Sequence, residues 1–253
     1  MMAKAKQATG KKPAKIETAM ILGAGFGTRM APLTDTKPKP LVPLCGKPLI
    51  DWPIDRLAAA GVTRFVVNTH YLPEQMAAHF KGRDDVALTH ESEIQETGGG
   101  VRDALDKIGA KPFFVTSSDA IWFDGIKPAV QRMLDAWDPE KMDALLLLVP
   151  VTDSYGYDGP GDYYLEPDAR AVHRGDRLVA PYLFGGLQIL KPALFADAPE
   201  GPFPLRIIYN KVQETGRLYA VTHDGEWYHV GTPESLKEVE EVIAAGYSKA
   251  NTR

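Results

Sequence analysis

Residues 19–43 read AMILGAGFGTRMAPLTDTKPKPLVP, and this stretch decides the fold. A short apolar strand, residues 19–22, is followed by glycines at alternate positions, which let the backbone turn tightly and bring N–H groups close to an anion. Arg29 lies inside the loop and Lys39 follows ten residues later, so two positive charges accompany the glycines. The combination predicts a pocket for a nucleoside triphosphate. It is not a Walker A loop, because no Gly-Lys-Ser/Thr closes it.

A dinucleotide-binding loop is the alternative, since glycines after a first strand also mark that fold. Here the spacing is G-x-G-x-G, and prolines follow the loop in place of an uninterrupted helix. Pro32, Pro38, Pro40 and Pro43 forbid a regular helix through this stretch. The sequence therefore favours a triphosphate loop.

Strand-like and helix-like runs alternate along the chain and indicate an α/β fold. The strands are expected at 19–22, 64–68, 86–90, 113–116, 144–151, 162–166 and 182–190, and the helices at 47–60, 73–80, 99–108 and 233–245. Strands separated by helices of about ten residues predict a mostly parallel sheet covered on both faces.

Composition limits the compartment and the partners. The net charge is −4, so a polyanionic substrate needs a local basic patch. We expect that patch at Arg29, Lys37, Lys39 and Lys47. No apolar run approaches the roughly 18 residues that span a bilayer. A lone Cys45 excludes an internal disulfide and suits a reducing cytoplasm.

The N-terminal residues 1–15 carry five lysines and no acid, without the apolar segment of a secretory signal. We expect a flexible basic tail over residues 1–17 and a single domain over 18–253. Neither a nucleic-acid partner nor a membrane partner is expected, and the oligomeric state stays open.

The motifs together resemble those of the sugar-1-phosphate nucleotidyltransferases: a glycine loop with G-T-R, then P-L-T, then P-K-P-L-x-P, over about residues 19–244. The resemblance implies a Rossmann-like three-layer sandwich with a mostly parallel mixed sheet, of the nucleotide-diphospho-sugar transferase type. It also implies that Arg29 holds the triphosphate and that Lys39, rather than Lys37, contacts phosphates near the reacting centre. The nucleotide contacts expected in and beside the loop are Leu22, Gly23, Ala24, Gly25, Gly27, Thr28 and Ser117.

Asp119 follows the strand at 113–116, in the run Ser117-Ser118-Asp119. In an open α/β sheet ligands bind outside the carboxyl ends of the strands, and a carboxylate there can hold Mg²⁺ against phosphates. The alternative is an aspartate that caps the next turn. By resemblance, an aspartate after this strand, usually in a Gly-Asp pair, is a metal ligand, and Ser118 takes the place of that glycine.

The run ESEIQETGGG, residues 91–100, lies between a strand and a helix. Three glycines at a helix start open space for a flat base or for N–H donors, or form a turn without a ligand. By resemblance this loop recognises the nucleobase, with Glu91 and Gly98 as the base and ribose contacts. Its E-T-G-G-G form resembles the enzymes that uridylylate N-acetylmuramic acid 1-phosphate in cell-wall recycling.

The segment WYHVGTPE, residues 227–234, departs from the family, which usually has a metal-binding aspartate directly before V-G-T-P. His229 stands there instead, and imidazole is a poor ligand for Mg²⁺. Three hypotheses compete. His229 contacts a water of a Mg²⁺ held by Asp119 and phosphates; or it binds a softer metal such as Mn²⁺, or protein and phosphate oxygens directly; or the activity is weakened or lost.

The lysine of a Glu-Lys-Pro segment, which grips the sugar phosphate in many relatives, is missing, since residues 165–167 read Leu-Glu-Pro. The neighbouring run 155–163 is rich in glycine, aspartate and tyrosine, which suit a sugar. We expect Gly161 and Asp162 to contact the sugar, with an exposed turn as the alternative.

The resemblance implies transfer of a nucleoside monophosphate from a nucleoside triphosphate to a sugar 1-phosphate, with release of pyrophosphate. Arg29, Lys39 and Asp119 are the expected catalytic residues, and Mg²⁺ (with Mn²⁺ as alternative) is the expected cofactor, bound by Asp119 and His229. UTP with N-acetylmuramic acid 1-phosphate is the first expected pair, and GTP with mannose 1-phosphate or another hexose phosphate is the second. A nucleotide-binding sensor without turnover is the alternative from another class, motivated by His229.

Overall fold

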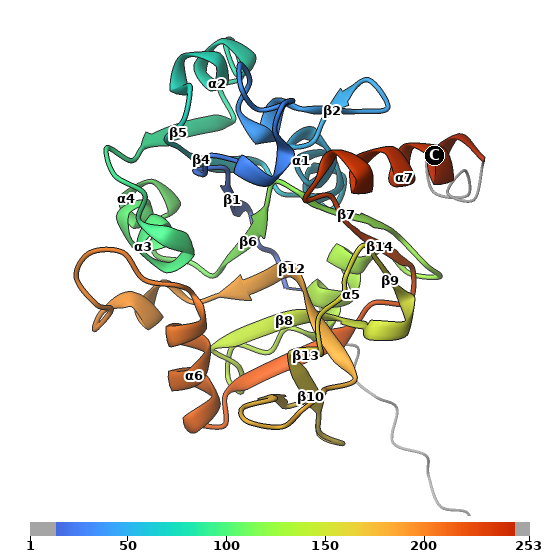
Figure 1. Cartoon of the computed structure of the whole chain (residues 1–253). Helices are drawn as coiled ribbons and strands as arrows, with labels where there is room; N and C mark the ends of the chain where they lie inside the picture. The colour runs from blue at the N-terminus through green and yellow to red at the C-terminus, as the bar shows by residue number, and fades with distance from the viewer. Residues whose placement is uncertain (1–13, 246–253) are drawn as a thin grey trace, which may run out of the picture.

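A nine-stranded mixed sheet forms the centre of the structure, a computed structural model that describes residues 14–245. One path of strands runs in the spatial order β11 (Ala171–His173), β10 (Tyr163–Leu165), β12 (Tyr182–Leu190), β6 (Phe113–Ser117), β1 (Thr18–Leu22), β4 (Arg64–Thr69) and β5 (Val86–His90). β8 (Ala144–Pro150) pairs with β12, and β13 (Leu218–Thr222) pairs with β8. Figure 1 shows β1, β6, β12, β8 and β13 following one another through the molecule.

The neighbours of β1 are parallel to it, whereas the neighbours of β12 are antiparallel to it. β1 is parallel to β4 and β6, as are β4 to β5 and β8 to β13, whereas β12 is antiparallel to β6, β8 and β10. The predicted mixed sheet is confirmed. Parallel pairs do not predominate, because the second half of the chain returns in antiparallel strands.

A β-bulge between Phe184 and Gln188 bends β12. Gly186 lies in this bulge with φ of +80°, and a Cβ there would lie 2.9 Å from the Ala120 Cβ and 3.3 Å from the Ser117 Oγ. Glycine is therefore required at this position. Before the bulge Tyr182 pairs with β10, and from Leu187 onward β12 pairs with β6.

Two small sheets and seven α-helices complete the fold over residues 14–245. The small sheets contain β7 (Ala120–Phe123), β14 (Glu226–His229) and β9 (Ser154–Tyr155), and β2 (Pro43–Leu44) with β3 (Lys47–Pro48). The helices are α1 (Asp51–Ala59), α2 (Pro73–His79), α3 (Glu96–Asp103), α4 (Leu105–Ile108), α5 (Ala129–Ala136), α6 (Arg206–Glu214) and α7 (Pro233–Ala244). Short 3₁₀ helices lie at Thr28–Met30, Lys39–Leu41, Val151–Asp153 and Pro192–Phe195.

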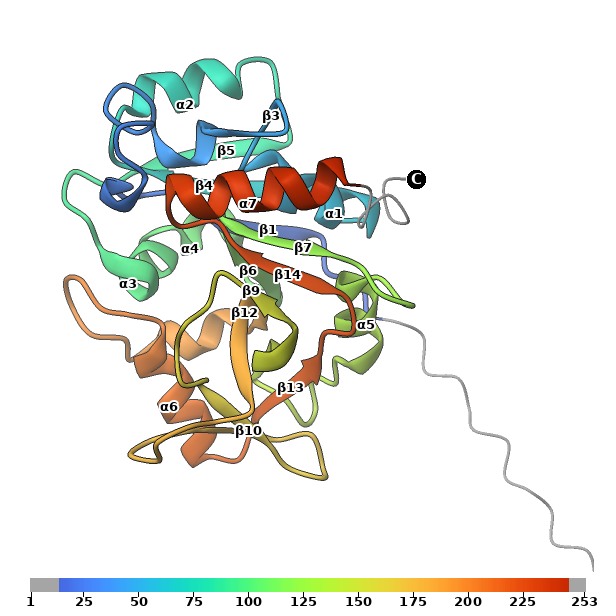
Figure 2. The same ribbon diagram turned by 45° about the vertical axis from the view of Figure 1, so that its right-hand side comes forward.

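Helices cover both faces of the large sheet, which confirms the predicted three-layer sandwich. Successive residues of a strand point to opposite faces. Accordingly, Ile21 joins a buried cluster with residues of α1 and α5, and Met20 joins a cluster with residues of α3 and α6. Figure 1 shows α3, α4 and α6 together on one side and α1 and α5 on the other. α7 packs Leu236 and Val239 into a third cluster beside β7 and β14, and Figure 2 shows it lying across the top of that small sheet.

The ends of some elements differ from the prediction. The helix expected from residue 47 begins at Asp51, because Lys47 and Pro48 pair with β2 in a hairpin. The helix expected over 99–108 begins at Glu96 and is divided at Ala104 into α3 and α4. The strands at 86–90 and 182–190 have the predicted bounds.

Residues 14–17, which the prediction assigned to the tail, pack against the rest of the structure. Ile16 is 5% exposed within the cluster under α1 and α5, and the Glu17 carbonyl accepts the Thr63 and Arg64 N–H groups, each at 3.0 Å. Residues 1–13 of that tail lie outside the described residues, and the single domain stays a prediction. Between residues 14 and 245, no helix has the length and apolar character needed to cross a membrane.

Candidate active site

The glycine loop begins where β1 ends and is anchored on both sides. The Gly23 N–H donates to the Asn68 Oδ1 at 2.8 Å, and a Cβ on Gly23 would lie 3.0 Å from the Asn68 carbonyl oxygen. Gly27 has φ of +63°; its carbonyl accepts the Thr34 hydroxyl at 2.9 Å, and a Cβ there would lie 2.8 Å from the Lys39 Cβ. The loop is therefore fixed between β4 and the P-K-P segment, so its amides are held ready for an anion.

Lys39 and Asp119 form an ion pair across 80 residues of sequence. The Lys39 Nζ lies 2.5 Å from the Asp119 Oδ2, and the two side chains are only 14% and 21% exposed. Burial raises the pKa of Asp119, but the charge and hydrogen bond of Lys39 outweigh it, with smaller contributions from His229 and the Ser117 hydroxyl, so the pKa lies below its usual value. Asp119 is therefore an ionised carboxylate at neutral pH.

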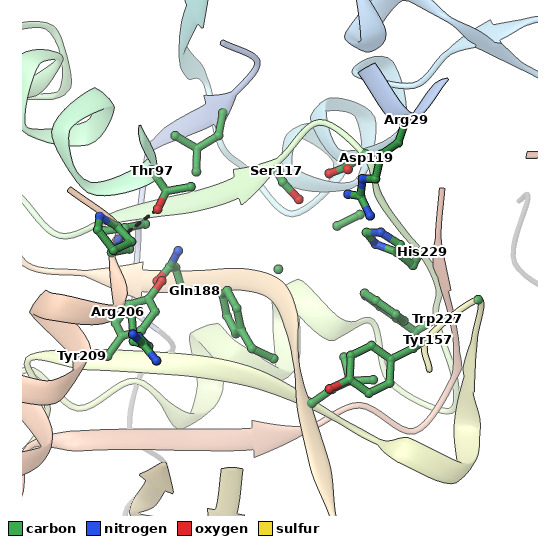
Figure 3. A pocket seen from close by; sticks show the side chains of 18 of the residues that line it. Arg29, Thr97, Ser117, Asp119, Tyr157, Gln188, Arg206, Tyr209, Trp227 and His229 are labelled. Atoms are coloured by element: carbon green, nitrogen blue, oxygen red, sulfur yellow. Dashed lines mark hydrogen bonds between the residues drawn. The ribbon is translucent and has the colours of Figure 1, made fainter. Parts of the chain in front are cut away.

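His229 ends β14 beside this pair. It is the ladder partner of Ala120, the residue after Asp119, and Figure 3 shows its ring, the Arg29 guanidinium and the Asp119 carboxylate close together. A Cβ on Gly231 would lie 2.6 Å from the His229 Nε2 and 3.6 Å from an Arg29 nitrogen, so glycine leaves room for both groups. Burial lowers the pKa of His229; the Asp119 charge opposes this and the neighbouring cations reinforce it. The imidazole is therefore neutral at pH 7.

Two cavities meet at Asp119. The smaller, of about 150 Å³, lies against the glycine loop, Lys39 and Ser118. The larger cavity has a volume of about 710 Å³. Leu22 and Asp119 line both cavities, so the two cavities adjoin at these residues. The polar and aromatic lining of the larger cavity includes Arg29, Thr97, Ser117, Tyr157, Gln188, Arg206, Tyr209, Trp227 and His229 (Figure 3). Two ligands, one in each cavity, would meet at the Asp119 carboxylate.

The predicted nucleotide contacts divide between these cavities. The smaller cavity is lined by Leu22, Gly23, Ala24, Gly25 and Gly27. Ser117 lines the larger cavity, and Thr28 faces a separate hollow with Phe26 and Tyr71. The structure thus brings most of the predicted loop residues to one pocket.

Glu91 lines neither cavity. Its side chain is buried; Oε1 accepts the Asn68 Nδ2 at 2.6 Å, and Oε2 accepts the Gln95 N–H at 2.9 Å. Because Asn68 also accepts the Gly23 N–H, one relay of hydrogen bonds connects the glycine loop to the residue before α3. Glu91 thus makes a positioning contact through both carboxylate oxygens, and the predicted base contact stays a prediction.

The three glycines of α3 make room for protein. Gly98 and Gly99 both donate their N–H groups to the Phe203 carbonyl, at 2.8 and 3.1 Å, and a Cβ on Gly98 would lie 2.3 Å from the Phe203 ring. A Cβ on Gly100 would lie 2.6 Å from the Glu91 Oε1. The amide of Gly98 is thus bonded to protein in this conformation, and the predicted ribose contact of Gly98 stays a prediction.

Gly161 and Asp162, the predicted sugar contacts, lie behind the larger cavity. The Gly161 N–H donates to the Tyr157 Oη at 3.0 Å, and the Asp162 Oδ2 accepts the Phe184 N–H at 2.8 Å. A Cβ on Gly161 would lie 2.0 Å from the Ala180 carbonyl oxygen. Tyr157 and Phe184 line the cavity, whereas the two predicted residues support them from outside.

Sequence reasoning missed much of the wall of the larger cavity, including Gln188, Arg206, Tyr209 and Trp227. The Tyr209 hydroxyl donates to the Gln188 Oε1, and the Trp227 Nε1 donates to the Gly185 carbonyl at 2.9 Å. One signal was present, since a Gly-Gly pair inside a strand pattern indicates a bulge and a close approach of other residues.

The basic patch is smaller than predicted. The Lys47 Nζ lies 2.5 Å from the Asp55 Oδ2 and 4.7 Å from the centre of the Trp52 ring, and Lys47 lines neither of the two cavities. Lys37 is exposed and also lies off both walls. Of the two lysines weighed in the sequence, Lys39 is the one that pairs with Asp119, and its predicted contact with phosphates stays a prediction.

Comparisons with known proteins agree with this arrangement. Residues 18–159 match the family model described as Nucleotidyl transferase. The N-acetylmuramate alpha-1-phosphate uridylyltransferase of Caulobacter vibrioides is 40% identical over 233 residues, which are 89% of this chain and 96% of that protein. The enzyme of the same name from Neisseria meningitidis serogroup B is 34% identical over 236 residues, 90% of this chain and 98% of that protein.

More distant proteins share the fold. A UDP-glucose pyrophosphorylase complexed with UDP-glucose superposes with a TM-score of 0.75 at 18% identity, covering 91% of this chain and 99% of that one. A putative glucose-1-phosphate thymidylyltransferase from Bacillus anthracis gives a TM-score of 0.75 at 20% identity, covering 89% and 94%. These likenesses support the predicted fold class, and the family match covers more than half of the chain. The chain therefore belongs to the nucleotidyl transferase family.

Proposed function

We propose that this nucleotidyltransferase transfers uridine monophosphate from UTP to N-acetylmuramic acid 1-phosphate and releases pyrophosphate. The observation that carries the substrate assignment is the pair of relatives with that activity in their names, 40% and 34% identical and covered over 96% and 98% of their lengths. The two cavities that meet at Asp119 support a reaction between two substrates. We place the enzyme in the cytoplasm, in the recycling of cell-wall sugars.

The reaction depends on positioning and on charge neutralisation. The attacking oxygen belongs to the sugar phosphate and is ionised at neutral pH, so no general base is needed. It forms a bond to the α-phosphorus while the bond to pyrophosphate breaks in line. In this proposal the loop amides and Arg29 bind the triphosphate, and Lys39 neutralises the phosphates around the α-phosphorus.

Asp119 suits a magnesium ion. It is ionised, lies on the walls of both cavities and uses Oδ2 for Lys39. Residues 14–245 contain no group of three or more histidine, cysteine, aspartate or glutamate side chains arranged for a metal. The single carboxylate of Asp119 fits Mg²⁺, which is bound by one or two carboxylates and fills its other positions with water and substrate phosphates. When bound, Mg²⁺ would neutralise and orient the reacting phosphates.

His229 would contact the hydration shell of this ion. Its imidazole is neutral at pH 7 and lies beside Asp119, so it can donate or accept a hydrogen bond without repelling a cation. Mn²⁺ is the softer metal that the same pair of side chains would accept.

GTP with mannose 1-phosphate is the second candidate. The mannose-1-phosphate guanylyltransferase catalytic subunit beta of Danio rerio is 29% identical over 86% of this chain. The chain covers only 62% of that longer protein, so this relative carries less weight than the two uridylyltransferases.

Pyrophosphate release with Mg²⁺ tests the proposal. ATP, CTP, GTP and UTP are each combined with the 1-phosphates of N-acetylmuramic acid, N-acetylglucosamine, mannose and glucose. Release with UTP and the muramic substrate is expected. Release with GTP and mannose 1-phosphate would favour the second candidate. Binding of a nucleotide without release in any well, also with Mn²⁺, would favour the sensor hypothesis.

A further inference from the structure

Arg206 is an exposed residue on the wall of the larger cavity. It is the first residue of α6, and among residues 14–245 its guanidinium makes no hydrogen bond and no ion pair. Figure 3 shows Arg206 with Tyr209 and Gln188 at one end of the cavity, whereas Asp119 and His229 lie at the other end. A permanently charged side chain therefore faces the part of the cavity that is remote from the candidate reacting centre.

The segment 201–205 fixes where Arg206 enters the cavity. The Leu205 N–H donates to the Thr97 Oγ1 at 2.9 Å, and the Phe203 carbonyl accepts the two glycine amides of α3. Arg102 Nη1 donates to the Gly201 carbonyl at 2.9 Å, and its guanidinium lies 5.6 Å from the centre of the buried Phe203 ring. A hydrogen bond from the E-T-G-G-G run thus fixes the position of Leu205, the residue directly before Arg206.

The other polar groups at this end are neutral. Gln188, Tyr209 and Thr97 supply amide and hydroxyl groups, which suffice for sugar hydroxyls and for an acetamido group. Asp158, an exposed acid on the same wall, makes no ion pair with Arg206 in the described part of the chain. A guanidinium adds a planar fork that matches a carboxylate. A neutral hexose 1-phosphate has no anion to place here, because its phosphate belongs at Asp119.

We infer that Arg206 binds a carboxylate on the sugar and so selects N-acetylmuramic acid 1-phosphate over neutral sugar phosphates. This inference rests on the proposed function. N-acetylmuramic acid carries a lactyl ether on the C3 oxygen, and N-acetylglucosamine 1-phosphate is the same molecule without that group. With the C1 phosphate at Asp119, the lactyl carboxylate extends across the ring toward the other end of the cavity. Arg206 is then a specificity-determining residue that takes no part in the bond changes.

Steady-state kinetics of Arg206→Gln test this assignment. The variant should raise the KM for N-acetylmuramic acid 1-phosphate about 10- to 100-fold, the size expected for lost hydrogen bonds to a charged group. The kcat, the KM for UTP and the constants for N-acetylglucosamine 1-phosphate should stay within about twofold, because a contact remote from the reacting atoms contributes uniform binding. Arg206→Lys keeps the charge and should recover part of the loss. Arg64→Gln, at an exposed arginine that opens β4, is the matched control.

Glucuronic acid 1-phosphate, a second anionic sugar, separates the possible outcomes. If the wild type prefers the muramic substrate and Arg206→Gln keeps that preference, the inference is overturned and the proposed function stands. An equal loss on both amino sugars also overturns it, because that result indicates a structural role. If the wild type prefers another anionic sugar and the variant loses that preference, the proposed sugar substrate is wrong and the role of Arg206 in binding a carboxylate is supported. Preference of the wild type for a neutral sugar overturns both.

Discussion

Asn68→Ala breaks the relay between the glycine loop and α3 at a residue that itself lines neither cavity. Asn68 is 3% exposed; its Oδ1 accepts the Gly23 N–H at 2.8 Å and its Nδ2 donates to Glu91 at 2.6 Å. The substitution removes both hydrogen bonds. The Glu91 carboxylate then keeps only the hydrogen bond from the Gln95 N–H and remains buried.

The expected loss follows from these two bonds. A neutral amide hydrogen bond contributes about 1 kcal/mol and one to a charged group about 1.5–3 kcal/mol, so the unfolding free energy should fall by about 2.5–4 kcal/mol. For a chain of this length each kcal/mol shifts the Tm by about 2–4 °C, so the Tm should fall by about 5–16 °C. The KM for UTP should rise, because the Gly23 amide loses its anchor, whereas the KM for the sugar phosphate should stay unchanged.

Thermal unfolding followed by circular dichroism measures the first effect, and pyrophosphate release at varied UTP measures the second. Asn210→Ala is the matched control, since Asn210 is an exposed asparagine of α6 whose side chain makes no hydrogen bond within the described residues. Its Tm should stay within about 2 °C of the wild type. A Tm for Asn68→Ala inside that same interval would refute the relay.

Three further predictions concern the catalytic end and the pH dependence of stability. Asp119→Asn and Lys39→Met should each lower kcat about 10²- to 10³-fold, because each removes one preorganised charge; pyrophosphate release within about tenfold of the wild type would contradict the assigned roles. His229→Asp places a second carboxylate beside Asp119 and should lower the Mg²⁺ concentration needed for half-maximal rate; an unchanged Mg²⁺ titration would contradict this. Burial lowers the pKa of His223 below its ordinary value of 6.5, so the unfolded chain binds a proton that the folded chain does not. Stability should therefore be retained above about pH 6.5 and should decrease as the pH falls below it. His223→Gln should weaken this decrease in urea unfolding at about pH 7.5 and 5.5, and equal slopes in both proteins would count against it.

The phosphate end of the site could be predicted because it depends on local motifs at neighbouring strand ends. Leu22 of β1 and Ser117 of β6 are partners in the parallel ladder. The glycine loop and Asp119, which follow these two residues, therefore had to lie at the same edge of the sheet. Lys39 was picked out by the P-K-P motif, but its ion pair with Asp119, 80 residues away, was not predicted and is seen only in the structure.

The sugar end could not be predicted, because distant parts of the chain assemble it. Arg206 enters through a contact between Leu205 and Thr97, 108 residues apart. Trp227 arrives on β14, whose strand character the sequence did not reveal. Glycine is also ambiguous in a sequence: Gly98 reads as an open amide, and only the position of Phe203 shows that a protein carbonyl occupies it.

Because the walls of the two cavities share Leu22 and Asp119, one molecule can occupy both. A bisubstrate inhibitor that joins a nucleotide to a sugar across Asp119 would gain its second set of contacts intramolecularly, at an effective concentration of about millimolar. The nucleotide-sugar product has the same span. It leaves only when both sets of contacts are broken, so inhibition by the product follows from the shape of the site.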